Sequence, residues 1–418
     1  MCQEFFPDNT PISDWFYDIP EVTVDDLGKQ YLITDYGIAD DNKVYTEKFQ
    51  ALIDEVSENG GGVIVVPGGT FYTGSLFFKP GVNLYIEENG VLKGSDDICD
   101  YPLCVTRIEG ETCRYFPALL NADGVNGFRI CGKGTIDGNG EKSWRAFWLR
   151  RRWNPKCTNK DEQRPRLLFV SNSENVLVSG ITLQNSHFWT SHYYKCRYVK
   201  IINCGFFSPV KPVAAPSTDG VDIDACTDVL VKGCRFHVND DAIALKGGKG
   251  PDAAVLPENG VNERVIVEDC IYDYCHSCLT CGSESVHNRN IILRNINVGA
   301  AYQLLWLKMR LDTPQHYEYI TVQNARGKVS DFMNINPWKQ FFDLKGQDTI
   351  PLSYADNITV KDSEIECDKY LNVKTKRDQY ILSDFTFENL NVTAKYTSFP
   401  EDAIDNLTLK NVTVKTKE

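Results

Sequence analysis

A short apolar segment followed by a polar turn recurs along the second half of the chain. The copies share a polar first residue, a run of mostly apolar or β-branched residues and a polar residue near the end: 175–181, 228–234, 264–270, 290–296, 357–363 and 406–412. Self-similarity at periods of roughly 20–50 residues is typical of solenoids. The pattern therefore indicates successive coils of one elongated fold.

Aligning the copies gives two columns. The interior column is small or apolar throughout: Ile181, Cys204, Cys234, Cys270, Ile296, Ala325, Ser363, Leu390 and Val412. The column before it holds turn residues, which tolerate left-handed backbone angles: Gly180, Asn203, Gly233, Asp269, Asn295, Asn324, Asp362, Asn389 and Asn411. Interior positions are 22 (390 to 412) to 38 (325 to 363) residues apart, too close for strand–helix–strand units. We predict an all-β, right-handed, single-stranded parallel β-helix; a sandwich is the poorer alternative.

The first coils are predicted at 60–67 and 72–78. Ahead of them, residues 46–58 have helical spacing of apolar residues and are expected to form a short N-terminal capping helix: Phe49, Leu52, Ile53 and Val56. The predicted organisation is an N-terminal extension over residues 1–30 and a parallel β-helix catalytic domain over residues 31–418.

Composition says more about the possible binding partners than about the fold. The repeat accounts for a length of 418 residues without several domains. Since no run of eighteen apolar residues occurs, no membrane span is expected, and residues 1–4 lack a signal-peptide pattern. The net charge of −13 argues against nucleic acid or anionic membranes as partners.

Fifteen cysteines are present, and their placement carries the information. Cys204, Cys234 and Cys270 occupy one position in three successive repeats, which indicates a stack of buried free thiols. Such thiols behave as small hydrophobic residues. A disulfide framework is the less favoured reading.

Candidate chemistry gathers at Asp219, the pair Asp240–Asp241 and His276. Asp240 follows Cys234 by six residues and His276 follows Cys270 by six, so both are expected to be neighbours on adjacent coils. Asp219 lies 21 residues before Asp240, on the coil below. Each acid alone is most simply a strand cap, but convergence of three acids with a histidine favours a catalytic cluster.

Glycoside hydrolysis needs one protonated carboxyl for the leaving oxygen and one ionised carboxylate for water. Packing like charges together raises one pKa and leaves another low. We assign Asp240, flanked by Asp219 and Asp241, as the hypothetical general acid. Asp219 and Asp241 would share the water as general bases.

Several motifs resemble the polygalacturonase family of glycoside hydrolases (family 28). The family signature Asn-Thr-Asp, Asp-Asp, Gly-His-Gly and Arg-Ile-Lys corresponds to Ser217-Thr218-Asp219, Asp240-Asp241, Cys275-His276-Ser277 and Trp306-Leu307-Lys308. Further matches are Asp35-Tyr36-Gly37, the segment 60–67, residues 134–138 and Asn185-Ser186-His187-Phe188-Trp189. The resemblance implies inverting hydrolysis of α-linked galacturonic acid residues in pectin, with His276 tuning protonation of the cluster. It also implies an acidic plant cell-wall polysaccharide or oligosaccharide as partner and no cofactor or metal. This substrate class slightly favours a periplasmic or secreted location, and the compartment is otherwise open.

The chain departs from the family pattern where the substrate carboxylate is held. Trp306 replaces the arginine of Arg-Ile-Lys. In a strand, Lys308 and Arg310 face the same way as Trp306, so these two cations are expected to replace the lost pair. Trp306 would stack on a sugar or simply pack between coils. We read the change as a shift towards a branched or mixed pectin such as rhamnogalacturonan.

Other residues are expected to complete the cleft. Lys246 is a candidate ligand of the substrate carboxylate, although a lysine at a strand end is commonly just exposed. Trp338 and Lys339 are candidates for one wall. The insertion 247–261 would favour attack at chain ends by closing one end of the cleft, but the sequence leaves endo and exo action open.

Three alternatives stay open. Cys275, His276, Cys278 and Cys281 contain a Cys-x-x-Cys pair, so a zinc site has to be weighed against the absence of a second pair. A calcium-dependent β-helix polysaccharide lyase would need a basic residue as proton acceptor. A non-enzymatic carbohydrate-binding solenoid would show aromatic rows without converging acids.

Overall fold

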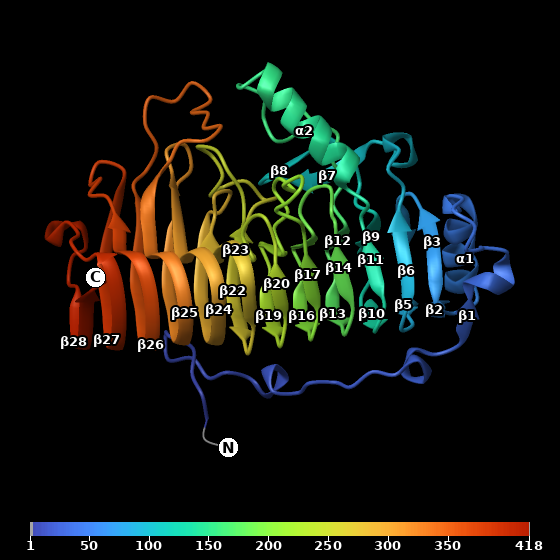
Figure 1. Cartoon of the computed structure of the whole chain (residues 1–418), viewed down its shortest axis with the longest axis horizontal. Coiled ribbons are helices and arrows are strands. Elements are labelled where there is room, and N and C mark those ends of the chain that lie inside the picture. The colour runs from blue at the N-terminus through green and yellow to red at the C-terminus, as the bar shows by residue number, and fades with distance from the viewer. Residues whose placement is uncertain (1–2, 418) are drawn as a thin grey trace.

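The computed structural model describes residues 3–417, which wind into a parallel β-helix (Figure 1). Its strands form one 26-stranded sheet whose pairings run parallel. Among the described residues, the paired strands β7 and β8 form a separate antiparallel hairpin. The predicted all-β parallel β-helix is confirmed.

Each coil contributes strands to three stacked ladders. The first ladder begins with β1 (Gln30–Leu32), β2 (Gly62–Val66), β5 (Val82–Ile86), β10 (Arg129–Gly132), β13 (Glu174–Ser179), β16 (Arg197–Ile202), β19 (Thr227–Lys232) and β22 (Val261–Glu268). The second begins with β3 (Gly69–Thr73), β6 (Gly90–Gly94), β11 (Thr135–Asp137), β14 (Thr182–Gln184), β17 (Gly205–Phe207) and β20 (Arg235–His237). The third begins with β4 (Leu76–Phe78), β9 (Leu120–Asp123), β12 (Leu168–Ser171), β15 (Ser191–Tyr194), β18 (Val221–Asp224) and β21 (Ile243–Lys246).

Later coils continue these ladders in longer strands. They are β23 (Ile271–Cys281), β24 (His287–Arg310), β25 (His316–Trp338), β26 (Ser353–Val373), β27 (Tyr380–Tyr396) and β28 (Thr408–Thr416). The remaining elements are the helices α1 (Thr46–Glu58) and α2 (Glu141–Trp153), the hairpin strands β7 (Cys104–Ile108) and β8 (Glu111–Tyr115), and five short 3-10 turns: Asp14–Phe16, Val24–Leu27, Ile33–Tyr36, Ile98–Asp100 and Glu401–Ala403.

The predicted turn column adopts left-handed angles at every position, with φ between 50° at Asn411 and 77° at Gly180. Its side chains also bond from coil to coil. Asn324 Nδ2 donates to Asn295 Oδ1 at 2.9 Å, and Asn411 Nδ2 donates to Asn389 Oδ1 at 3.0 Å. The column therefore turns each coil and links it to its neighbour.

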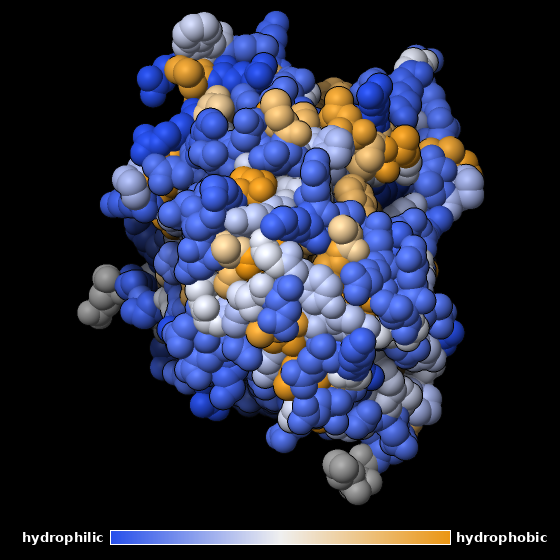
Figure 2. Space-filling model, turned by 90° about the vertical axis from the view of Figure 1, so that its right-hand side faces the viewer, coloured by the Kyte–Doolittle hydropathy of each residue, from blue (hydrophilic) through white to orange (hydrophobic). Residues whose placement is uncertain are grey.

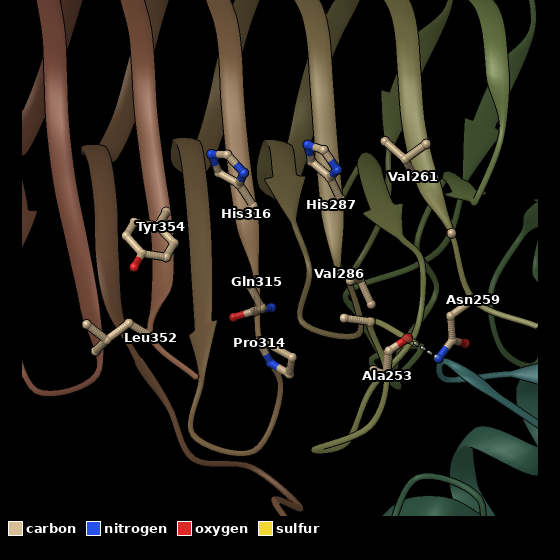
Figure 3. A pocket seen from close by; sticks show the side chains of 12 residues that line it. Ala253, Asn259, Val261, Val286, His287, Pro314, Gln315, His316, Leu352 and Tyr354 are labelled. Carbon is tan, nitrogen blue, oxygen red and sulfur yellow. Dashed lines mark hydrogen bonds between the residues drawn. The ribbon is translucent and has the colours of Figure 1, made fainter. Parts of the chain in front are cut away.

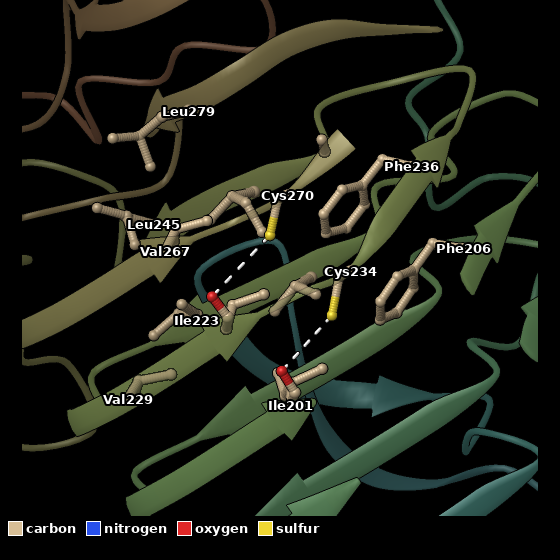
Figure 4. Close-up of a cluster of buried hydrophobic side chains, with 14 of the residues drawn as sticks. Ile201, Phe206, Ile223, Val229, Cys234, Phe236, Leu245, Val267, Cys270 and Leu279 are labelled. Carbon is tan, nitrogen blue, oxygen red and sulfur yellow. Dashed lines mark hydrogen bonds between the residues drawn. The ribbon is translucent and has the colours of Figure 1, made fainter. Parts of the chain in front are cut away.

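The core runs along the inside of the coils (Figure 4). The interior column is buried from Ile181 to Leu390, and Val412 on the terminal coil is half-buried. The thiols of Cys234 and Cys270 contact the carbonyls of Ile201 and Val231. None of the cysteines between Cys99 and Cys367 forms a disulfide. The predicted stack of free thiols is present.

Helix α1 spans the residues predicted for the cap and buries all four predicted apolar residues against the first coils. It lies at the N-terminal end of the β-helix in Figure 1. Seen from that end, the surface is mostly hydrophilic with scattered hydrophobic residues (Figure 2). The predicted capping helix is confirmed.

The N-terminal extension crosses the outside of the first ladder as a long strap (Figure 1). Phe6, Ile12 and Phe16 are buried in a cluster with outward-facing residues of five coils: Leu177, Ile202, Leu230, Ile266 and Ile292. The Asp8 carboxylate accepts hydrogen bonds from Arg289 and Asn290. Met1 and Cys2 lie outside the described residues.

Two elements absent from the sequence-based prediction cover part of the third ladder. Helix α2 follows β11, and the hairpin β7–β8 follows β6. The Arg107 guanidinium on the hairpin donates to both oxygens of Asp224 on β18, at 3.0 and 3.3 Å. No helix formed by residues 3–417 is both long and apolar enough to cross a lipid bilayer.

Candidate active site

The predicted acids lie beside the outer face of the third ladder, just before its strands begin. Asp219 precedes β18, and Asp240 and Asp241 precede β21. Backbone bonds hold these loops in register, since Gly220 N donates to the Asp241 carbonyl and His276 N donates to the Asp240 carbonyl. The coil repeat thus places residues from three stretches of sequence side by side.

The three carboxylates converge. One oxygen each from Asp219, Asp240 and Asp241 lies within 4.8 Å of the other two. Asp219 and Asp241 are buried, whereas Asp240 is half-buried. An all-oxygen set of this kind is what Ca²⁺ or Mg²⁺ prefers, but cationic side chains already neighbour all three acids.

Asp240 pairs with His276, whose Nδ1 lies 3.4 Å from Asp240 Oδ1. Burial raises the pKa of Asp240, but His276 and Lys308 outweigh it and lower the pKa to about 2. Burial lowers the pKa of His276, and the charge of Asp240 outweighs burial, so this pKa is raised. The expectation that crowding raises the pKa of Asp240 is therefore wrong for the free protein, because its nearest charged neighbour is a cation.

The raised carboxyl pKa belongs to Asp219. Burial, followed by the charges of Asp222 and Asp240, raises the pKa of Asp219 well above its ordinary value. Burial also raises the pKa of Asp222 well above the ordinary value. Crowding therefore raises one carboxyl pKa while another stays low, as expected, but the raised pKa is that of Asp219 and not that of Asp240.

Two lysines supply positive charge inside the pocket. Lys308 Nζ donates to Asp241 Oδ2 at 2.6 Å. Lys246 Nζ lies 3.4 Å from Glu284 Oε2 and 3.7 Å from Asp219 Oδ2. Both side chains are buried, so their charges act in a weakly screened environment.

Aromatic side chains adjoin these lysines. Lys308 Nζ lies 4.2 Å from the Trp306 ring centre and 4.8 Å from that of Trp338, and the two rings meet edge to face. Lys246 Nζ lies 4.7 Å from the Trp189 ring centre. Trp306 and Trp338 both line the pocket.

Arg310 does not line the pocket, contrary to prediction. Its buried guanidinium binds both oxygens of Asp312, at 2.6 and 2.8 Å, and donates to the Phe341 carbonyl. Strand alternation places Arg310 on the same strand face as Lys308. Its guanidinium is nevertheless bound to Asp312, two residues further along the chain, and does not reach the pocket. Among the four predicted substrate ligands, Lys246, Trp306 and Lys308 face the pocket. Of the two predicted wall residues, Trp338 does so and Lys339 lines a separate cavity.

Several pocket residues were missed from the sequence. Glu284 pairs with Lys246, and Asn159, Glu109 and Gln340 reach the pocket from segments outside the repeat. Trp189 was noted only as part of a motif. Asp222 lies 3.7 Å from Lys246. It could have been predicted from the sequence, because it occupies an outward-facing strand position close to Asp219.

The zinc alternative is not supported. Cys275, Cys278 and Cys281 are fully buried in the hydrophobic core, whereas His276 lines the pocket. A residue facing the core and one facing the cleft do not share a tetrahedral ion.

A larger cavity of about 350 Å³ shares no lining residue with this pocket (Figure 3). His287 and His316 stack on adjacent strands there, with ring centres 5.1 Å apart. Glu318 and Asp356 pair with them at 2.9 and 2.7 Å. These contacts form a satisfied ladder of ion pairs, and the cavity holds no counterpart of the crowded carboxylates.

Comparison with known proteins agrees with this geometry. The sequence profile of the glycosyl hydrolases family 28 matches residues 104–301. A Vitis vinifera protein named "Probable polygalacturonase" is 29% identical over 221 residues, which cover 51% of this chain and 43% of that protein. An Aspergillus fumigatus protein named "Probable endo-xylogalacturonan hydrolase A" is 30% identical over 196 residues, covering 46% of this chain and 43% of that protein.

The fold has a close structural counterpart. The crystal structure of an exopolygalacturonase from Thermotoga maritima superposes with a TM-score of 0.75 at 22% identity, over 93% of this chain and 92% of that one. At this identity the likeness shows the fold. The match to the two curated relatives spans less than half of their length, 43% in each case. The profile match and these relatives assign residues 104–301 to the glycosyl hydrolases family 28, and the superposition shows the shared fold.

Proposed function

We propose that the protein hydrolyses bonds of α-linked galacturonic acid residues in pectic polysaccharides or their oligosaccharides. The observation that carries the proposal is one small pocket in which Asp219, Asp240 and Asp241 face each other beside Lys246 and Lys308. Carboxyl groups of unequal protonation supply acid and base, and the lysines complement an anionic sugar. Relatives named for polygalacturonase and xylogalacturonan hydrolase activity support this substrate class.

In the proposed reaction, water attacks the anomeric carbon while the bond to the leaving oxygen breaks. Asp219 and Asp241 hold the water between them. Because the raised pKa keeps a proton on Asp219, Asp241 is the acceptor of the water proton. The leaving oxygen receives a proton from Asp240. The protein therefore takes up one proton, on Asp241, and releases one, from Asp240.

The proton for the leaving group is held by Asp240 and His276 together. At a pH between their two pKa values the pair carries one proton, which rests on His276 in the free protein. Transfer from His276 Nδ1 to the facing Asp240 oxygen creates the acid that the leaving oxygen needs. The two groups therefore titrate as a unit, and His276 is the proton reservoir of the general acid.

The stereochemical outcome is a separate part of the proposal. Inverting glycosidases usually separate their carboxyl groups by about 6.5–9.5 Å, and retaining ones by about 5–5.5 Å. The spacing here, within 4.8 Å, is short for inversion. We propose inversion because the resemblance to the polygalacturonases implies it; the anomer first released tests this point.

Substrate recognition is proposed to rest on Lys308, Lys246 and the Trp306–Trp338 pair. The lysines would hold the sugar carboxylate, and the indole rings would offer apolar faces to the ring carbons. A tryptophan in place of the family arginine removes one carboxylate contact and adds a stacking surface. This favours a mixed backbone such as rhamnogalacturonan alongside polygalacturonan.

A substrate panel tests the proposal. Polygalacturonan, xylogalacturonan and rhamnogalacturonan are incubated with the wild type and with Asp240→Asn, and both reducing ends and unsaturated-sugar absorbance are recorded. We expect new reducing ends without absorbance, lost in the variant. Calcium-dependent absorbance would indicate a lyase, and binding without cleavage would indicate a carbohydrate-binding solenoid.

A further inference from the structure

Four inserted segments contact one another in a closed ring, and three of them reach the pocket through Glu109, Asn159 and Gln340. They are the hairpin β7–β8, the loop 247–260, the loop 339–352, and helix α2 with the segment 154–166 that follows it. None of them belongs to the coil repeat. Because each reaches its neighbour, the shape of the site is set by these insertions and not by the open groove of a bare β-helix face.

The hairpin closes on the loop 247–260. Glu111 Oε2 lies 3.4 Å from Lys249 Nζ. At the hairpin tip, a Cβ on Gly110 would come within 2.8 Å of the Glu284 side chain and 3.1 Å of the Gly248 backbone. This approach leaves no passage for a polysaccharide chain at that end of the pocket.

The other junctions complete the ring. Gln347 Nε2 donates to Asp252 Oδ1 at 3.0 Å, which joins the loop 339–352 to the loop 247–260. The Arg151 guanidinium of α2 lies over the Phe341 ring at 5.7 Å. Asn159 Nδ2 donates to Glu109 Oε1 at 2.9 Å, which returns the contacts to the hairpin.

Exposure shows which side of the pocket is open. The side chains of Lys246 and Asp219 are each 4% exposed, whereas those of His276 and Asp240 are 31% and 26% exposed. The cavity volume is about 150 Å³, well below the roughly 300–1,000 Å³ of pockets for drug-sized ligands. The lysines therefore lie at the closed end, the proton-donating pair lies at the mouth, and the volume suits about one sugar ring.

An exposed aromatic side chain stands at that mouth. Tyr302 lies beside His276 on the next coil, with ring centres 5.2 Å apart, and is 46% exposed. Its hydroxyl accepts a hydrogen bond from Tyr274 at 3.3 Å. An exposed tyrosine next to the proton donor is placed to stack on the sugar that leaves.

We infer that the pocket is a dead end that admits only the terminus of a galacturonate chain, so that the protein removes single uronic acid residues from chain ends. This inference rests on the proposed hydrolase function. The terminal residue fills the closed end against Lys246 and Lys308, its glycosidic oxygen faces Asp240, and the rest of the chain leaves past Tyr302.

The test is the size of the first products. Galacturonate oligomers and polygalacturonate are digested to low conversion and the products are separated by length. We expect the monomer and the substrate shortened by one residue, with little loss of polymer viscosity per bond cleaved. Intermediate oligomers from the start would overturn the inference alone. Failure to cleave any galacturonate substrate would overturn it together with the proposed function.

A ring-opening variant tests the structural cause. Gly260 N donates to the Gly247 carbonyl at 3.0 Å, so the base of the loop is already closed and residues 249–258 can be replaced by an Asn-Gly turn. This change removes the contacts with Glu111 and Gln347. Intermediate oligomers should appear and viscosity should fall several-fold faster per bond cleaved.

Val255→Ala is the matched control, because Val255 sits in the same loop and is 81% exposed. It should keep the wild-type product pattern. A folded loop-replacement variant that still releases only monomer would overturn the ring as the cause, and the wild-type product pattern decides the inference even if that variant does not fold.

Discussion

At the scale of single residues, one proton shared by Asp240 and His276 sets when the proposed reaction runs. Their contact at 3.4 Å joins a carboxyl of lowered pKa to an imidazole of raised pKa. At mild pH the carboxyl of Asp240 alone would be ionised, whereas the pair holds one proton that either group can carry.

Asp240→Asn removes this acid while keeping the size of the side chain. General acid catalysis is worth about 10²–10⁴ in rate, so kcat should fall by that factor while KM changes little. Steady-state kinetics on galacturonate oligomers measures both. Asp356→Asn, whose carboxylate pairs with His316 outside the pocket, should behave as wild type, and equal losses in the two variants would contradict the assignment.

The pH profile should carry the signature of His276. Because its pKa is raised, the proton is fully present below the ordinary histidine pKa near 6.5 and is lost as the pH rises through the higher folded value. The alkaline limb of kcat/KM should therefore lie above 6.5 in the wild type. His276→Gln should remove that limb and lower the rate; an unchanged limb in the variant would rule out the reservoir role.

At the scale of elements, the left-handed turn column links the ladders. Asn324 has φ of 52°, donates to Asn295 and sits between two buried strand stretches of β25. A residue with a Cβ pays about 1–2 kcal/mol in this conformation unless, like Asn, its side chain bonds locally. At its asparagine positions, the column thus uses one side chain for both the turn and the contact between coils.

Asn324→Ala should lower the free energy of unfolding by about 1–2 kcal/mol, because alanine loses both the tolerance and the hydrogen bond. Asn324→Gly keeps the tolerance for a left-handed backbone and loses only the side-chain hydrogen bond, so it should lower the free energy of unfolding by less. Urea unfolding of the two variants compares them. Equal losses would mean that the amide ladder, and not backbone angle, stabilises the turn.

At the scale of the whole molecule, the N-terminal strap ties distant coils together. It runs from Asp8, bonded to Arg289 and Asn290 on β24, back to β1 at the opposite end of the strap. Phe6 and Phe16 meet edge to face, with ring centres 5.6 Å apart, and pack on the outward side chains of the first ladder. A solenoid otherwise relies on contacts between neighbouring coils.

Phe6→Ala should therefore destabilise the protein by about 3 kcal/mol or more, as expected for removing a buried phenylalanine. Its neighbour Phe5 is 52% exposed, so Phe5→Ala is a matched control and should cost far less. Hydrogen exchange of the strap, with chemical unfolding of the whole chain, separates the two. Similar behaviour of both variants would show that the strap does not stabilise the coils.

The arrangement of the whole molecule explains which features could be predicted from the sequence. The columns around Cys204 and Asn203 recur from residue 180 to residue 412, so the interior, the turns and the neighbourhood of Asp240 and His276 could be predicted from spacing. The ring around the pocket did not, because α2, the hairpin and the loop 247–260 interrupt the repeat and meet only in three dimensions. The predictions of the Asp240 pKa and of the Arg310 orientation were wrong for a related reason. Each property depends on one nearby charge, and the spacing of residues in the sequence does not give the distance to that charge.

The most direct test of the central claim is hydrolysis of a galacturonate oligomer in water enriched in ¹⁸O, followed by mass spectrometry of the products. Attack by water held between Asp219 and Asp241 predicts one heavy oxygen at each new reducing end, and none in Asp240→Asn, where cleavage is suppressed. Products without heavy oxygen, or with an unsaturated end, would show that water is not the attacking group and would contradict the account.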